Sequence, residues 1–330
     1  MTRRETTILK GVAILFMVWL HLFNHVDNYT SLFMLDGVPL PHFLSRATNP
    51  VAFFLLLSGY GLYAVHQKGD KHRFSRILKL FVHFWIILVV FVSIGSYVKP
   101  DRYPGSFTEF FYNFFALNTS YNGEWWFLFP YTLLAITSKY LFELTQKIKA
   151  RYIILGTYIL SLVTGFIISR YGQDYLYNNH LLYNPFLYFH LLPAFMWGAM
   201  LKRCDIIARF KCFIEERSIK AIFLWIALAA LFLTFCAIGH TAFHIIFVTA
   251  FAVIFVVAHR WKLFDQILEH LGKHSMNVWL IHTFFCYYLF HDLIYSLRWP
   301  IVIFAITLLL SLTCSYAIDI IAKPITKRIK

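Results

Sequence analysis

Residues 8–27 read ILKGVAILFMVWLHLFNHVD, an apolar run that contains Lys10 near its start and His21 near its end. At 1.5 Å of rise per residue, a helix of about 20 residues crosses a hydrocarbon core of about 30 Å. A charged start before an apolar stretch is also typical of a signal peptide, but no small-residue cleavage site follows Leu22. The run therefore predicts a retained membrane-spanning helix.

Similar apolar runs recur along the whole chain. Hydrophobic residues make up 59% of the sequence and charged residues only 14%, so lipid is the main solvent expected for this protein. No internal repeat, low-complexity tract or soluble appendage is visible. We predict an all-α membrane protein, a bundle of about ten transmembrane helices in a single domain over residues 1–330. The runs lie near residues 8–27, 50–66, 77–98, 126–145, 151–170, 184–202, 218–238, 241–258, 274–290 and 300–322.

The formal net charge of +14 reflects topology rather than nucleic-acid binding. If the amino terminus is inside and the runs alternate, nearly all of the 30 lysines and arginines fall on the inner side. This is the positive-inside pattern, and it predicts that both termini are cytoplasmic. The basic residues left on the outer side are Arg46, Lys99, Arg102, Arg170 and Arg298.

The ionisable residues inside the apolar runs are the first candidates for chemistry, because placing one at the bilayer centre costs roughly 2.5–3.5 kcal/mol or more. Lys10 and His21 are 11 residues apart, which puts both on one helical face, with Lys10 at the cytoplasmic end. A neutral imidazole can accept a proton from an attacking hydroxyl, so His21 is a candidate general base. A histidine that only hydrogen-bonds between helices explains the residue equally well.

A basic triplet begins the third predicted helix. Arg73, Arg76 and Lys79 recur every three residues, so they share a helical face at the positive end of the helix dipole. This arrangement suits phosphate binding, although positive-inside anchoring explains the same residues without a ligand.

The outer connection at residues 99–125 carries phenylalanines at helical spacing. They predict a short amphipathic helix in the membrane interface or, alternatively, an aromatic lid beside an acceptor site. The five rings are those of Phe107, Phe110, Phe111, Phe114 and Phe115. The five cysteines show no paired spacing, so neither a disulfide framework nor a metal site is expected.

Together these motifs resemble the acyltransferase-3 family of bacterial membrane acyltransferases, over nearly the full chain. Lys10-X10-His21 looks like the family's basic-X10-His signature, and Phe53 to Tyr60 looks like its Phe-Leu-Ser-Gly-aromatic motif. Arg76-Ile-Leu-Lys79 stands where the family has Arg-X-X-Arg, with lysine as a departure, while Arg73-Phe-Ser-Arg76 fits the spacing literally. The remaining matches are Glu124-Trp-Trp-Phe-Leu128, Pro193 to Gly198, and Leu271 to His282.

The resemblance implies a catalytic His21, a cytoplasmic acyl-CoA donor, most often acetyl-CoA, and an acceptor hydroxyl on a cell-surface or lipid-linked glycan. It implies a bacterial cytoplasmic membrane location and no metal. We expect Lys10 with the basic triplet to hold the CoA phosphates. Glu124 either orients the acceptor or the imidazole, or is an ordinary interfacial carboxylate. Substrate contact and structural support both stay open for Ser58, Tyr60, Trp125, Trp126, Ser275 and His282.

The main alternative is a transporter or flippase for a glycan or a lipid-linked precursor, because intramembrane histidines and arginines also mark such pathways. Inverted repeats or paired broken helices would favour it, and the sequence has none. A structural membrane scaffold is a third possibility, but it leaves the ordered motifs unexplained.

Overall fold

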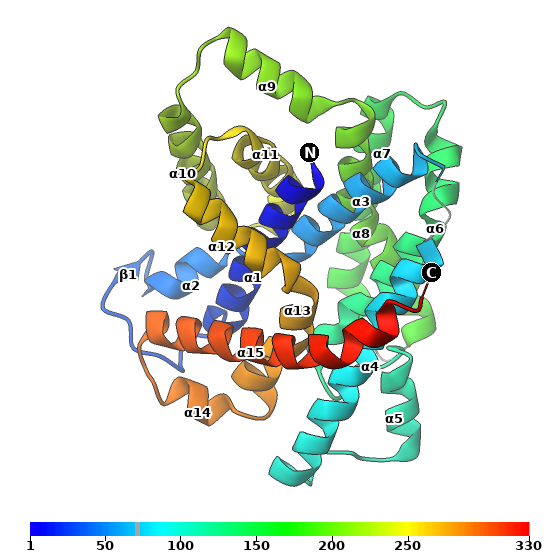
Figure 1. The fold of residues 1–330 in the computed structure, drawn as a ribbon, viewed down its shortest axis with the longest axis vertical. Helices are drawn as coiled ribbons and strands as arrows, with labels where there is room; N and C mark the ends of the chain where they lie inside the picture. Colours follow the sequence, from blue (N-terminus) through cyan, green and yellow to red (C-terminus); the bar gives the residue numbers. More distant parts are fainter. Residues whose placement is uncertain (70–72, 178, 330) are drawn as a thin grey trace. The chain divides into compact units, whose positions relative to one another are not determined.

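The computed structural model describes residues 1–69, 73–177 and 179–329 (Figure 1). Helix makes up 78% of the residues, which confirms the all-α expectation. In the described ranges, the strands are a two-residue antiparallel pair, β1 (Met34–Leu35) and β2 (Val38–Pro39), at a turn after the first helix.

In the described part of the chain, five helices are long and apolar enough to cross a membrane. Two shorter apolar helices are α3 (Val51–His66) and α11 (His244–Val257). Helices lie at all ten predicted runs, but the number of crossings and the side of each terminus stay predictions. The five long helices are α1 (Arg3–Phe23), α4 (Arg73–Val98), α7 (Ala150–Tyr171), α10 (Ala221–Ile238) and α15 (Pro300–Thr326).

The contacts divide the chain into two compact units, and each is described separately. Unit 1 comprises Met1–Leu9, Val51–Arg73 and Phe129–Asp265, and unit 2 comprises Lys10–Pro50, Phe74–Leu128 and Gln266–Lys330. The boundary cuts through α1, so the Lys10-X10-His21 signature lies in unit 2. The single functional domain expected from the sequence stays a prediction.

Unit 1 is organised by the packing of α3 on α8 (His180–Arg203). A Cβ at Gly59 would lie 1.8 Å from the carbonyl oxygen of Phe195, and one at Gly198 would lie 1.9 Å from that of Leu56. Only glycine lets the two backbones approach so closely, as is common between membrane helices. Two of the motifs that carry the family resemblance therefore pack on each other. The unit also contains α6 (Leu128–Thr145) except for its first residue, η2 (Gly172–Leu176), α9 (Ile206–Glu216), η3 (Thr241–Phe243), α7, α10 and α11.

Unit 2 holds α13 (Ser275–Thr283) against α15, with α4 and α1 also contributing side chains to its buried polar contacts. A Cβ at Gly11 would lie 2.1 Å from the carbonyl oxygen of Leu268, so α1 packs closely on α12 (Lys262–Lys273). The remaining elements are α2 (Leu40–Ser45), α5 (Phe107–Phe114), η1 (Gly123–Phe127), η4 (Phe284–Tyr288) and α14 (His291–Tyr295).

The predicted amphipathic helix is present as α5. Ser106 caps it by accepting a hydrogen bond from the Glu109 backbone N–H. Trp85 of α4 donates its indole N–H to the Phe114 carbonyl at 2.9 Å, and the two rings stack at 4.8 Å. Phe107 is 83% exposed at the other end. One end of the aromatic face therefore packs on α4, and an interfacial or lid role stays a prediction.

Candidate functional site

His21 lies between a second histidine and a carboxylate. Its Nδ1 is 2.6 Å from Nε2 of His282, and its Nε2 is 3.3 Å from Oε2 of Glu124. The three residues come from the end of α1, the end of α13 and η1, and we call them the His21 cluster. The His21 side chain is 12% exposed and that of Glu124 is 28% exposed, whereas His282 is fully buried.

Hydrogen bonds hold the segment that carries Glu124 on α13 and η4, among them one from the Thr283 hydroxyl to the Asn122 side-chain oxygen at 3.0 Å. The Asn122 amide donates to the Thr283 hydroxyl at 2.8 Å, the Gly123 N–H donates to the Tyr288 hydroxyl at 2.8 Å, and the Trp125 indole donates to the Leu280 carbonyl at 2.9 Å. Asn122 also caps η1, because its side-chain oxygen accepts from the Glu124 N–H. Both neighbours of Glu124 are therefore held, Gly123 through its backbone N–H and Trp125 through its side chain.

The chain after His282 leaves α-helical geometry. Residues Phe284–Tyr288 form a π-helical turn, a feature frequent at functional sites. Within it, the Tyr287 hydroxyl donates to Asn24 at 3.1 Å, and the Tyr287 ring meets that of His21 edge-on at 5.9 Å. The turn thus joins α13 to the end of α1 beside His21.

The electrostatics of Glu124 depend on His21. Burial by itself raises the pKa of the Glu124 carboxyl, but the hydrogen bond from His21 and the charge of a protonated His21 outweigh burial and leave this pKa below its usual value. Glu124 is therefore a carboxylate that stabilises a positive charge on His21. A histidine beside a carboxylate is an arrangement suited to general-base catalysis.

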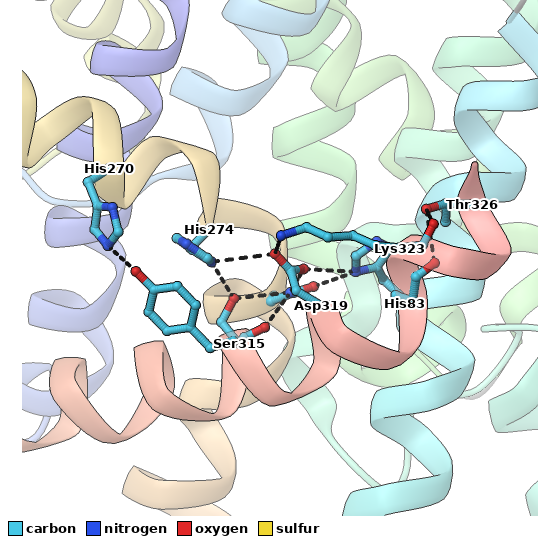
Figure 2. A network of polar contacts seen from close by, with 10 residues as sticks. His83, His270, His274, Ser315, Asp319, Lys323 and Thr326 are labelled. Carbon is cyan, nitrogen blue, oxygen red and sulfur yellow. Dashed lines mark hydrogen bonds and ion pairs between the residues drawn. The ribbon is translucent and has the colours of Figure 1, made fainter.

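A second buried polar cluster occupies the start of α13, and Figure 2 shows it. Asn277 donates to Asp319 at 2.9 Å and accepts from His83 Nδ1 at 2.8 Å. Lys323 pairs with Asp319 at 3.0 Å, and Nδ1 of His274 is 2.9 Å from the Ser315 hydroxyl. These contacts join α4, α13 and α15. We call this set the Asp319 cluster; its members are His83, His274, Asn277, Ser315, Asp319 and Lys323.

Comparison with known proteins assigns the family. A family model described as an acyltransferase domain, Acyl_transf_3, matches residues 5–320. The chain belongs to this acyltransferase family. No curated protein and no solved structure matches. The matched residues include the His21 cluster and, except for Lys323, the Asp319 cluster.

The predicted donor-binding residues of the acyltransferase lie on two helices. Lys10 is exposed on α1 although Ile8, Leu9 and residues 11–14 around it are buried. On α4, Arg76 is exposed and Lys79 is partly buried. Arg73 begins α4, and its side chain lies outside the described residues. A shared phosphate site stays a prediction.

Two predicted support residues belong to unit 1 and have partners there. The Ser58 hydroxyl donates to the Tyr131 hydroxyl at 3.3 Å, and the Tyr60 hydroxyl lies 2.5 Å from the Met1 amino nitrogen. These contacts are compatible with structural support, one of the two roles left open for them.

The other support residues belong to unit 2. Trp125 is fully buried, with its ring against those of Phe84 and Phe284, whereas Trp126 is partly exposed. Ser275 is buried as the first residue of α13. His282 contacts His21 directly, so of the six support candidates it is the one that joins the cluster.

Several residues of the site were not among the sequence candidates. Asn122, Thr283, Tyr287 and Tyr288 are neutral polar residues near the ends of runs, where such residues are common, and no local pattern distinguishes them. His83 and Asp319 carried a usable signal. Both lie inside predicted apolar runs, so the energetic argument applied to His21 applies to them as well.

Proposed function

We propose that this acyltransferase moves an acyl group, which we expect to be acetyl, from cytoplasmic acyl-CoA to a hydroxyl of a cell-surface or lipid-linked carbohydrate. The observation that carries the proposal is the position of His21 between Glu124 and His282. An accessible imidazole paired with a carboxylate is suited to general-base work on a hydroxyl. A transport role does not account for this pairing in a family of acyltransferases.

The proposed reaction is a direct transfer. His21 removes the hydroxyl proton as the acceptor oxygen attacks the thioester carbonyl carbon, and the negative charge of Glu124 stabilises the imidazolium that forms. A carbon–oxygen bond replaces the carbon–sulfur bond. The proton on His21 then passes to the leaving thiolate, so CoA departs as the free thiol and the imidazole is restored.

Lys10 and the basic triplet are proposed to bind the CoA phosphates. Lys10 is exposed within an otherwise buried part of α1, so a ligand can contact its side chain. Arg76 adds an exposed guanidinium on α4, and guanidinium groups form strong, charge-assisted hydrogen bonds to phosphate. The Arg73 side chain enters this proposal from sequence alone.

The test compares two histidines that lie four positions apart in the sequence. Cells that lack the gene are complemented with the wild type, His21→Ala or His25→Ala, and their surface glycans are analysed by mass spectrometry. We expect the acetyl increment with the wild type and with His25→Ala, because His25 is exposed, and its loss with His21→Ala. Purified wild-type protein should also release free CoA thiol from acetyl-CoA in the presence of the acceptor glycan.

Three outcomes contradict the proposal. An unchanged glycan inventory with and without the wild-type gene contradicts a carbohydrate acceptor. A fully active His21→Ala protein contradicts the proposed base. Movement of a glycan across the membrane without consumption of acyl-CoA would favour a transporter instead.

A further inference from the structure

We propose that His282 is a positioning residue that fixes the tautomer of His21. The nitrogen of His21 that takes the hydroxyl proton is then Nε2, on the side of Glu124. This inference rests on the proposed function, because it specifies how the general base of that reaction is held. All three residues lie in unit 2.

The partners of His282 determine where its proton lies. Its Nδ1 is 2.9 Å from the carbonyl oxygen of Val278 and 3.0 Å from that of Trp279. A carbonyl oxygen only accepts, so Nδ1 of His282 must carry a hydrogen. The ring is fully buried, and a buried imidazolium without a counter-ion in contact is costly. His282 is therefore neutral, and its Nε2 is an acceptor.

The proton on His21 follows from that assignment. Nε2 of His282 lies 2.6 Å from Nδ1 of His21, so Nδ1 of His21 is the donor in this hydrogen bond. When His21 is neutral, its other nitrogen, Nε2, has no hydrogen, and the hydrogen bond from Nε2 to Glu124 forms only when the ring is protonated. The backbone carbonyls of α13 thus set the protonation of His21 through His282, as an outer partner commonly does for a functional histidine.

The burial of the three side chains favours the approach of an acceptor from the Glu124 side of His21. His282 fills the Nδ1 side and is fully buried, whereas Glu124 on the Nε2 side is 28% exposed. A hydroxyl that approaches from the Glu124 side meets the lone pair of Nε2. It donates its proton there as its oxygen attacks the thioester, and the new N–H then faces the Glu124 carboxylate. The same proton leaves from Nε2 to the CoA thiolate.

The experiment uses two substitutions at His282 in the purified full-length protein. His282→Gln places an amide oxygen at about the distance of Nε2 and keeps an acceptor for His21 Nδ1, whereas His282→Leu removes the acceptor. The readouts are CoA thiol release from acetyl-CoA with the acceptor glycan, as kcat and KM across pH, and the melting temperature. His274→Gln and His274→Leu are matched controls, because His274 is a buried histidine next to the start of the same helix.

We expect His282→Leu to lower kcat by roughly 10²- to 10⁴-fold with little change in KM for acetyl-CoA. A fall in rate of this size is typical when a general base, or the residue that fixes its tautomer, is removed. Its pH–rate profile should differ from that of the wild type, because the neutral ring of His21 is then no longer held in one tautomer. His282→Gln should recover most of kcat and the wild-type profile. Both His274 variants should keep the wild-type profile.

A purely structural role predicts other results. In that case His282→Gln and His282→Leu lose activity in proportion to their melting temperatures, and the pH–rate profile of neither changes, which overturns the inference. Failure of the proposed function is distinguishable, because the wild type would then release no CoA thiol or His21→Ala would retain full activity.

Discussion

The two ends of α13 contain nearly the same residue types in different arrangements. The His21 cluster contains two histidines and one carboxylate, and so does the Asp319 cluster. In the Asp319 cluster the carboxylate is paired with Lys323 at 3.0 Å and with the Asn277 amide at 2.9 Å, while both histidines stay 3.9 Å away. In the His21 cluster, the described residue that pairs with the Glu124 carboxylate is His21.

In the proposed mechanism, this difference separates a chemical site from a structural one. Asp319 already holds an ion pair with a lysine and a hydrogen bond from an amide, while both histidines lie 3.9 Å away, and these contacts join α4, α13 and α15. A carboxylate whose partner is a histidine stabilises each proton that the histidine accepts. The identity of the counter-charge, rather than the presence of histidine and carboxylate, distinguishes the two clusters.

The largest expected effect comes from removing the negative charge of one carboxylate at a time. Glu124→Gln keeps the shape of the side chain but cannot stabilise the imidazolium, so kcat should fall roughly 10²- to 10³-fold. Asp319→Asn should change kcat by less than about threefold at a temperature where both variants are folded. Steady-state CoA release by the purified variants measures both. Equal losses of kcat in the two variants would remove the distinction between the clusters.

The next effect concerns stability. Here we expect the larger loss in Asp319→Asn and the smaller loss in Glu124→Gln. Asp319→Asn weakens hydrogen bonds that join three helices, and we expect the free energy of unfolding to fall by about 1–3 kcal/mol. Glu124→Gln should lower the free energy of unfolding less, because Glu124 is partly exposed and the hydrogen bond of the neighbouring Gly123 N–H remains. Melting temperatures in one detergent provide the comparison. A Glu124→Gln protein that melts below Asp319→Asn would contradict a structural role that belongs mainly to the Asp319 cluster.

A smaller effect should follow substitution of the proposed phosphate-binding residues, which belong to neither cluster. Lys10→Gln and Arg76→Gln each remove one charge from the CoA phosphates, so KM for acetyl-CoA should rise roughly tenfold while kcat changes less. Lys139→Gln is a suitable control, because Lys139 is an exposed basic residue on a different helix and is predicted to lie on the same side of the membrane. An unchanged KM in both variants would leave these residues as topological anchors.

The smallest effect is expected at Lys323. Its side chain is 63% exposed, and an exposed ion pair contributes about 0–1 kcal/mol. Lys323→Ala should therefore shift the melting temperature much less than Asp319→Asn, with no change in kcat. A shift as large as that of Asp319→Asn would mean that the lysine, and not the hydrogen bonds of Asn277, dominates the stability of this cluster.

The candidate site was only partly predictable from the sequence. His21 was identified by a local energetic argument, since a histidine near the end of an apolar run is costly wherever the helix packs. Glu124 and His282 were named through the family resemblance, with structural roles left open for both. His282 is 261 residues from His21, and no periodicity relates two residues so far apart. Their contact depends on how α1 and α13 pack.

The Asp319 cluster was missed for a related reason. Asn277, Ser315 and His274 are ordinary residues within apolar or motif segments, and they become a cluster only when α13 lies on α15. The tertiary structure explains two of the glycine positions. Gly59 and Gly198 stood in two separate motifs, and their reciprocal backbone contacts explain why glycine occupies both.

The sequence by itself determined the all-α membrane character, the apolar segments and the acyltransferase family, because these depend on local composition and ordered motifs. Only the tertiary structure decided that His21 meets His282 on one ring nitrogen and Glu124 on the other. It also decided that Asp319 is committed to Asn277 and Lys323 instead. The physical reason is that a proton's position depends on the donor or acceptor a few ångströms away, and in this protein that partner comes from a distant helix.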